Sequence, residues 1–192
     1  MELAQHIHQP TLTRFPTGRN SQLEDLVKSV RASLTLPQDQ ADNIPPSVAK
    51  SLQSFLSAGE LLNQSQRQPN AETYQRHTLY RDEAGEFTIL ALVWLPGQET
   101  PIHGHMAWGA VGLYSGELQV TNYEIFGTRG GSLNLKQTSE FIAKEGDATS
   151  VTGGIDDIHK IKNVSSKPAI SIHVYGMDVV PESQSLNILF PQ

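Results

Sequence analysis

Short runs of strand-forming residues, separated by glycine-containing turns, follow one another from about residue 71 to residue 175 of this 192-residue chain. Many short strands joined by tight turns are typical of a β-sandwich or β-barrel and not of a parallel sheet with crossover helices. The pattern predicts the following strands: Thr73–Tyr80, Glu86–Trp94, Ala110–Tyr114, Glu117–Ile125, Ser132–Gln137, Phe141–Ala143, Ala148–Val151, His159–Val164 and Ala169–Tyr175.

The first 70 residues have a different pattern, which predicts helices joined by loops. Asn20 or Ser21 is suited to cap a helix whose apolar positions recur at spacings of three and four as far as Leu34. We expect a second helix after Pro45-Pro46-Ser47, ending near Gly59. We interpret the apolar stripes of both helices as faces packed on a neighbouring sheet; a partner-binding surface is the alternative.

Composition limits the classes of function. A chain of this length, 38% hydrophobic, predicts a single domain over residues 1–192, helical over 1–70 and a β-barrel over 71–192. A net charge of −6 without a basic run argues against nucleic acid and anionic membranes as partners. The absence of cysteine excludes disulfides and thiolate ligands. Without a signal-like or membrane-spanning pattern, we expect a cytoplasmic protein, either a monomer or a small homo-oligomer.

Two histidines, His103 and His105, flank a single glycine. Alternate residues of a strand point to the same face, so both imidazoles can reach one point, and His159 is a third candidate. Three imidazoles can bind zinc, iron, copper, nickel or manganese, and the spacing does not choose among them. Core histidines bonded to carbonyl groups are the alternative. We interpret a second pair, His6 and His8, as part of a polar terminal segment.

A second polar line is formed by Ser171, His173 and Tyr175, which alternate with aliphatic residues. In a strand these three side chains share one face. A tyrosine hydroxyl with an ordinary pKa of about 10 stays protonated at neutral pH, so it can donate a hydrogen bond to bound oxygen or substrate. The alternative is a polar edge that faces solvent.

The segments from Gly97 to His105 and from Gly146 to His159 resemble the two sequence motifs of the cupins. The resemblance implies a mainly β fold, a double-stranded β-helix or jelly-roll barrel, here with N-terminal α-helices. Many cupins supply a glutamate ligand shortly after the paired histidines, whereas Trp108, Gly109 and Ala110 stand there in this chain. Three neutral imidazoles would leave the full charge on a divalent metal, which favours an anionic ligand such as a thiolate. A closed four-ligand structural zinc site is disfavoured, because no fourth protein ligand is evident.

Among cupins the chain resembles the cysteine dioxygenase family of thiol dioxygenases. Three segments carry the resemblance: Tyr74-Gln75-Arg76, Pro101–His105, and Asp157–His159 followed by Ser171–Tyr175. It implies that His103, His105 and His159 hold one Fe²⁺ per chain, with Ser171, His173 and Tyr175 as a hydrogen-bonded line beside it. It further implies that Arg76 binds a substrate carboxylate, with Tyr74 on the same strand face. A guanidinium suits this role because its planar fork matches a carboxylate.

The predicted function is that of a non-haem iron thiol dioxygenase, which oxidises a small thiol with O₂ to a sulfinic acid. Arg76 favours L-cysteine, because 3-mercaptopropionate-oxidising relatives tend to carry glutamine there. The alternatives are a 3-mercaptopropionate dioxygenase, another cupin oxygenase, and a metal-binding or sensing cupin without turnover. Two departures from the family are Gly104, where aspartate is usual, and the lack of the cysteine that animal members crosslink to the tyrosine; Gly109 or Ala110 stands there.

Three further features receive structural interpretations. We expect Trp94 and Trp108 to pack in the barrel, with Trp108 as a candidate wall near His105. His77 falls on the opposite strand face from Arg76, so we expect it outside the site. The Gly153-Gly154 turn lacks the lysine and helix of a phosphate-binding loop.

Overall fold

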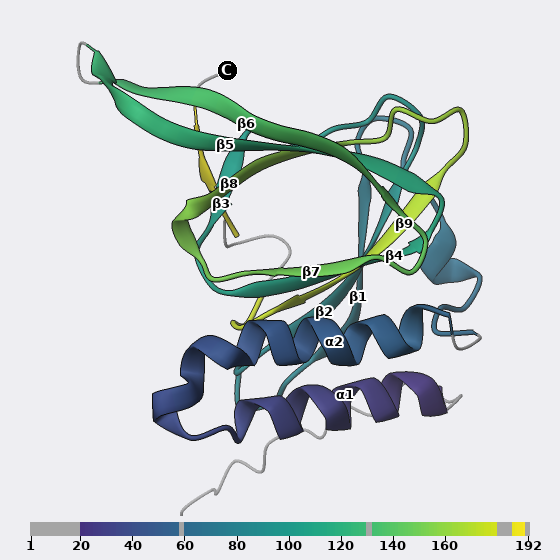
Figure 1. Cartoon of the computed structure of the whole chain (residues 1–192). Coiled ribbons are helices and arrows are strands. Elements are labelled where there is room, and N and C mark those ends of the chain that lie inside the picture. Colours follow the sequence, from purple (N-terminus) through teal and green to yellow (C-terminus); the bar gives the residue numbers. More distant parts are fainter. Residues whose placement is uncertain (1–19, 58–59, 130–131, 180–185, 191–192) are drawn as a thin grey trace, which may run out of the picture.

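The computed structural model describes residues 20–57, 60–129, 132–179 and 186–190. Two antiparallel sheets face each other as the walls of a barrel, and two helices lie side by side beneath one of them (Figure 1). This architecture confirms the prediction of a mainly β fold with N-terminal α-helices. The pair His6 and His8 lies outside the described residues.

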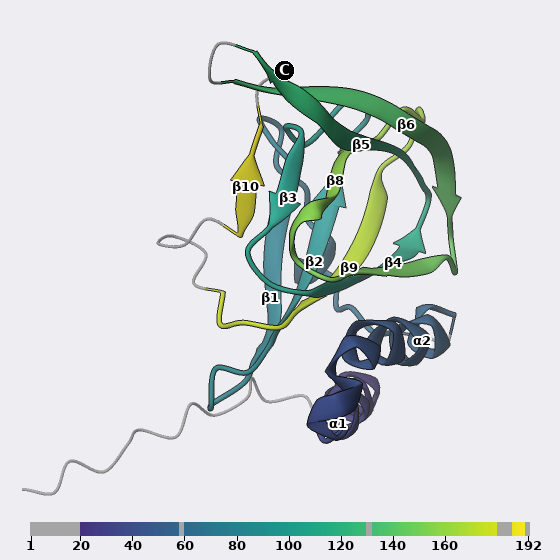
Figure 2. The same cartoon turned by 60° about the vertical axis from the view of Figure 1, so that its left-hand side comes forward.

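Each sheet has five strands, and neighbouring strands come from distant parts of the chain. The first sheet has the order β1 (Gln75–Arg81), β2 (Thr88–Trp94), β9 (Ala169–Tyr175), β4 (Gly109–Ser115) and β7 (Ala148–Val151). The second has the order β10 (Asn187–Leu189), β3 (His103–His105), β8 (Gly154–Lys162), β5 (Glu117–Arg129) and β6 (Ser132–Lys144). Figure 2 shows the short strand β10 lying alongside β3.

The helices are α1 (Ser21–Leu34) and α2 (Ile44–Leu56), and short 3-10 turns occupy Gln38–Asn43 and Ser65–Arg67. Asn20 caps α1 as predicted, because its side-chain oxygen accepts hydrogen bonds from the first-turn amides. The second helix begins before the two prolines and not after them. First-turn amides have no partner within a helix, so Pro45 and Pro46 cost it no hydrogen bond.

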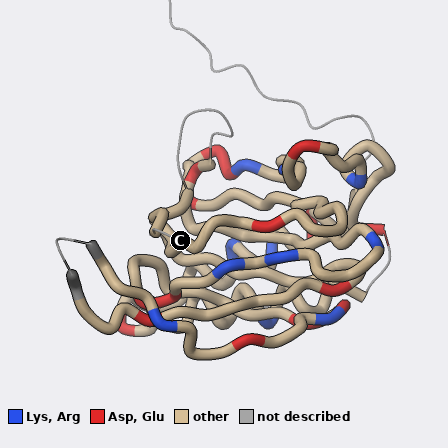
Figure 3. The backbone as a smooth tube through the Cα atoms, turned by 90° about the horizontal axis from the view of Figure 1, so that it is seen from above, with Lys and Arg blue, Asp and Glu red and all other residues tan. Residues whose placement is uncertain are grey.

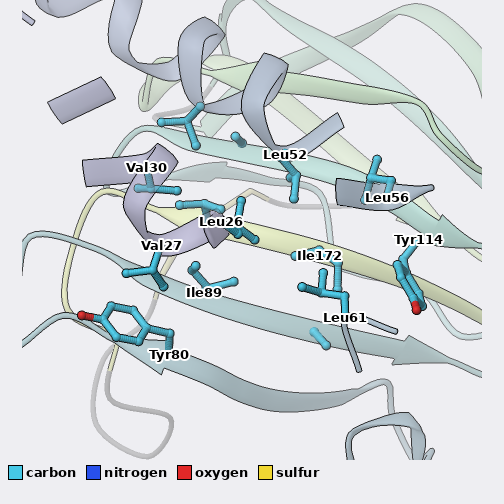
Figure 4. Packing of buried hydrophobic residues seen from close by; sticks show 14 of the residues in the cluster. Leu26, Val27, Val30, Leu52, Leu56, Leu61, Tyr80, Ile89, Tyr114 and Ile172 are labelled. Atoms are coloured by element: carbon cyan, nitrogen blue, oxygen red, sulfur yellow. The ribbon is translucent and has the colours of Figure 1, made fainter. Parts of the chain in front are cut away.

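The apolar faces of both helices pack on the outer face of the first sheet (Figure 4). Leu26 and Leu52 are fully buried there against Ile89 and Ile172 of the sheet. Gly112 of β4 lets α2 approach closely, since a Cβ there would lie 2.7 Å from the side chain of Leu56. The helical stripes are therefore packing faces.

Several strand predictions differ from the structure. The predicted strands Ser132–Gln137 and Phe141–Ala143 form one continuous strand, because β6 pairs with β5 along its whole length. The strand that carries His159 begins earlier, at Gly154. Strand β10 was not predicted, because three residues carry too little periodicity and only their pairing with β3 makes them a strand.

A second apolar cluster lines the interior between the sheets and includes Leu90, Trp94, Leu113, Leu118 and Ile161. Basic and acidic positions are interspersed along the backbone in the view from above (Figure 3). In the described part of the chain, no helix has the length and apolarity that crossing a membrane requires.

Candidate metal centre

Strand pairing brings the three predicted metal-binding histidines together. His103 on β3 lies directly opposite His159 on β8, and His105 lies on the same face of β3. One ligand atom from each imidazole falls within 4.8 Å of the others. The side chains are nearly inaccessible, with exposed fractions of 4%, 4% and 9% for His103, His105 and His159.

Backbone hydrogen bonds hold the segment before His103 against the end of β8 and the residue that follows it. The amide of Gly97 donates to the carbonyl of Asn163, and the amide of Thr100 donates to the carbonyl of Ile161. The hydroxyl oxygen of Thr100 accepts a hydrogen bond from the amide of Ile161. These hydrogen bonds, made by residues that precede His103 in the sequence, therefore stabilise the register that sets His103 opposite His159.

Gly104, between the paired histidines, is required by close backbone packing. A Cβ at this position would lie 2.6 Å from the carbonyl oxygen of Gly154, a distance that side-chain carbons do not tolerate. A glycine in place of the aspartate expected from the resemblance is therefore explained by how closely β8 approaches β3 here.

Burial keeps all three imidazoles neutral. It lowers the pKa of His103 and of His159, and it lowers the pKa of His105 to about 4. Neighbouring histidines add to the lowering for His105 and His159, and the charge of Arg76 adds to it for His103. The Nδ1 of His103 lies 3.0 Å from the carbonyl oxygen of Pro101, so it carries the proton and leaves Nε2 with a lone pair. The Nδ1 of His105 is buried without a hydrogen-bond partner among the described residues. Neutral, converging imidazoles with unused nitrogen atoms fit a divalent transition metal.

A small cavity of about 30 Å³ lies beside the three histidines. Arg76 and Tyr74 lie on its lining, and Arg76 is an exposed residue, which places it at the rim. The guanidinium of Arg76 donates a hydrogen bond of 3.0 Å to the hydroxyl of Tyr74. The ring of Tyr74 stacks on Trp94 with a centroid separation of 4.4 Å, which holds both residues at the cavity.

The predicted polar line is a continuous hydrogen-bonded chain on β9. The Oγ of Ser171 lies 2.8 Å from the Nε2 of His173, whose Nδ1 lies 3.1 Å from the hydroxyl of Tyr175. The indole N–H of Trp94 donates to the Oγ of Ser171 at 2.9 Å and extends the chain by one member. Burial lowers the pKa of His173 to about 3 and raises the pKa of Tyr175, so both are neutral.

The sequence predicted the positions of some residues around the cavity only in part. Trp94 packs in the barrel as predicted, but its bond to Ser171 could be anticipated only from the pairing of β2 with β9. Asn187 of the unpredicted β10 also lines the cavity. Trp108 is not among the lining residues and packs against the helix-covered cluster instead. Of the two candidates for the crosslink position, Gly109 is the residue paired with Tyr175.

Comparison with protein families shows which family the chain belongs to. The model of the family described as cysteine dioxygenase type I matches residues 48–182, which is more than half of the chain and includes every site residue named in the sequence analysis. The chain belongs to this family.

Several solved structures are similar to this member of the cysteine dioxygenase family. TT1209 from Thermus thermophilus is 21% identical, with a TM-score of 0.46 over 62% of this chain and 98% of that chain. A Cupin_2 domain of an XRE family transcriptional regulator from Enterobacter cloacae is 19% identical, with a TM-score of 0.40 over 56% and 100%. Oxalate decarboxylase from Bacillus subtilis is 16% identical, with a TM-score of 0.42 over 59% and 29%.

The buried neutral state of His173 predicts how stability depends on pH. Its folded pKa of about 3 lies below the unfolded value of about 6.5, so between these values the unfolded chain binds more protons. The free energy of unfolding therefore falls as the pH falls from about 6.5 toward 3. In the metal-free protein, H173Q should make this loss shallower by up to about 1.4 kcal/mol per pH unit. Urea unfolding of the unmodified protein and of H173Q at pH 7, 6 and 5 gives the free energy of unfolding at each pH. An equal pH dependence of this free energy in the two proteins would contradict the assignment.

Proposed function

We propose that this protein is a non-haem iron thiol dioxygenase that converts a small thiol, R–SH, and O₂ into the sulfinic acid R–SO₂H. The observation that carries the proposal is the convergence of three buried, neutral histidines with a guanidinium and a tyrosine hydroxyl on one small cavity. Membership of the cysteine dioxygenase family supports the same reaction class. L-Cysteine is the proposed substrate, because the cavity carries Arg76 at its rim.

His103, His105 and His159 would hold one Fe²⁺ per chain. The iron would supply the activation of dioxygen and a binding site for the thiolate. Because the three ligands are neutral, the protein leaves the positive charge of the metal to be balanced by the substrate. Burial of the histidines also limits the access of water to the site.

Arg76 would bind the carboxylate of the substrate at the rim of the cavity. Burial is the main cause of the lowered pKa of His173 and of the raised pKa of Tyr175. The positive charge of Arg76 adds to the first shift and opposes the second, so the guanidinium is electrostatically coupled to the cavity. Tyr74 restrains the guanidinium through their hydrogen bond, and Trp94 restrains Tyr74 by stacking. An ordered guanidinium binds a carboxylate at a lower entropic cost than a free one.

The hydrogen-bonded chain would direct the proton of Tyr175 into the cavity. An indole N–H can only donate, so Ser171 accepts from Trp94 and can use its own proton to donate to the Nε2 of His173. Neutral His173 then carries its proton on Nδ1 and donates it to the oxygen of Tyr175. In this arrangement every member of the chain is satisfied, and the phenol O–H remains free to donate to substrate or oxygen.

Oxygen uptake tests the function directly. Protein reconstituted anaerobically with Fe²⁺ should consume O₂ with L-cysteine and release one sulfinate per O₂ consumed. 3-Mercaptopropionate and cysteamine, tested in parallel, distinguish the roles of the amine and the carboxylate. A preference for 3-mercaptopropionate would redirect the substrate assignment, and no uptake with any thiol at full iron loading would contradict the proposal.

The variant R76A tests the carboxylate contact. A charge-assisted hydrogen bond stabilises a complex by about 1.5–3 kcal/mol, so the KM for L-cysteine should rise about tenfold or more. Cysteamine has no carboxylate, and its KM should change by less than about twofold. The matched control is R81A on the same strand, whose guanidinium pairs with Asp178 and does not line the cavity. Equal effects of R76A on both thiols would rule out this role.

The variant W94F tests the direction of the hydrogen-bonded chain. Phenylalanine retains an aromatic ring but removes the N–H that Ser171 accepts, so the orientation of the Tyr175 hydroxyl is no longer imposed. We expect kcat to fall about fivefold, as for the loss of one hydrogen bond, with the KM for thiol little changed. W108F replaces the tryptophan that does not line the cavity and should leave kcat unchanged. A rise in KM without a fall in kcat would assign Trp94 to substrate packing alone.

A further inference from the structure

A second cavity opens into the barrel on the side of strands β6 and β7. Its volume is about 340 Å³, far larger than the cavity beside the histidines. Its apolar lining comes from both sheets and consists of Val111, Leu113, Leu118, Val120, Phe141, Ala143, Ala148 and Ile161. Gln53, Asp147 and Thr149 also line it; all three are exposed residues, which places them at its mouth.

The two cavities share a wall. Val111 of β4 and Ile161 of β8 line both of them. Ser171 lines the second cavity, whereas His173 and Tyr175 of the same strand line the cavity beside the histidines. Val111 is only half-buried, and rotamer changes of such side chains are fast compared with enzyme turnover, so a small molecule can pass this wall without any change in the fold.

The linings of the two cavities suit different molecules. The cavity beside the histidines carries a guanidinium at its rim and polar groups inside, which suits a charged thiol. Apart from Asp147 at the mouth, none of the described residues that line the second cavity carries a charge. An apolar cavity offers water few hydrogen bonds and readily accepts small apolar solutes such as xenon.

We propose that the second cavity is a binding site for dioxygen, from which the gas reaches the candidate metal centre past Val111 and Ile161. The inference rests on the proposed function, because the proposed reaction consumes dioxygen and needs such a supply. Dioxygen would then enter on the side of β6 and β7, while the thiol binds at the rim formed by Tyr74 and Arg76. A bound thiol would not block the approach of the second substrate.

The variant A143F tests the route by filling the second cavity from β6. The kcat/KM for O₂ should fall about fivefold or more, while the KM for L-cysteine at saturating O₂ should stay within about twofold. The matched control is I142F, which adds the same ring at the neighbouring position on the opposite, exposed face of β6. V120F fills the cavity from β5 and should reproduce the effect if A143F fails to fold.

A measurement without turnover separates this inference from the proposed function. Dissolved O₂, which is paramagnetic, should broaden the methyl NMR signals of Leu113, Leu118 and Val120 in the unmodified protein, and xenon should shift the same signals. Both effects should be lost in A143F and kept in I142F. Gas binding without O₂ consumption would overturn the oxygenase assignment and leave the gas site standing.

Two results would overturn the dioxygen site itself. The first is a cavity that neither gas perturbs, which would mean that it holds only solvent. The second is an A143F variant that has lost xenon binding but retains the kcat/KM for O₂ of the unmodified enzyme.

Discussion

The pairing of His103 with His159 across β3 and β8 is the interaction on which the rest of the site depends. These residues are 56 positions apart in the sequence, so only the barrel brings them together. Thr100 hydrogen-bonds to β8 and Gly97 to the residue that follows β8 on one side of this pair, and Gly104 allows the carbonyl of Gly154 to pass on the other. The geometry of the candidate metal centre is thus imposed by backbone contacts, and the side chains adopt the positions that the backbone dictates.

Burial of the side chains from solvent determines the protonation states at this centre. Burial keeps the histidines neutral at physiological pH and raises the pKa of Tyr175 further above that pH. The same burial is costly in acid, because a protonated imidazole is poorly accommodated there. Metal binding would recover part of the cost of burying unpaired nitrogen atoms, such as the Nδ1 of His105.

The barrel separates the polar cavity beside the histidines from the largely apolar second cavity. Arg76 and Tyr74 lie on β1 and the preceding turn, at one edge of the first sheet, whereas the second cavity is bordered by β7 at the opposite edge. Ser171, His173 and Tyr175 lie on β9, near the middle of this sheet, and reach from one cavity to the other. A single strand therefore supplies both the hydrogen-bonded chain of the site and part of the lining of the second cavity.

Local patterns in the sequence determined the mainly β fold and the packing faces of the helices. They also determined that His103 and His105 share one strand face, and that Ser171, His173 and Tyr175 share another. These properties depend on periodicities of two and of three to four residues, which any short segment displays by itself. The tertiary structure alone decided the existence of β10, the bond from Trp94 to Ser171, the need for Gly104 and the shared wall of two cavities. Each of these arises from the register between strands that are distant in the chain, and that register is set by packing over the whole barrel and not by any one segment.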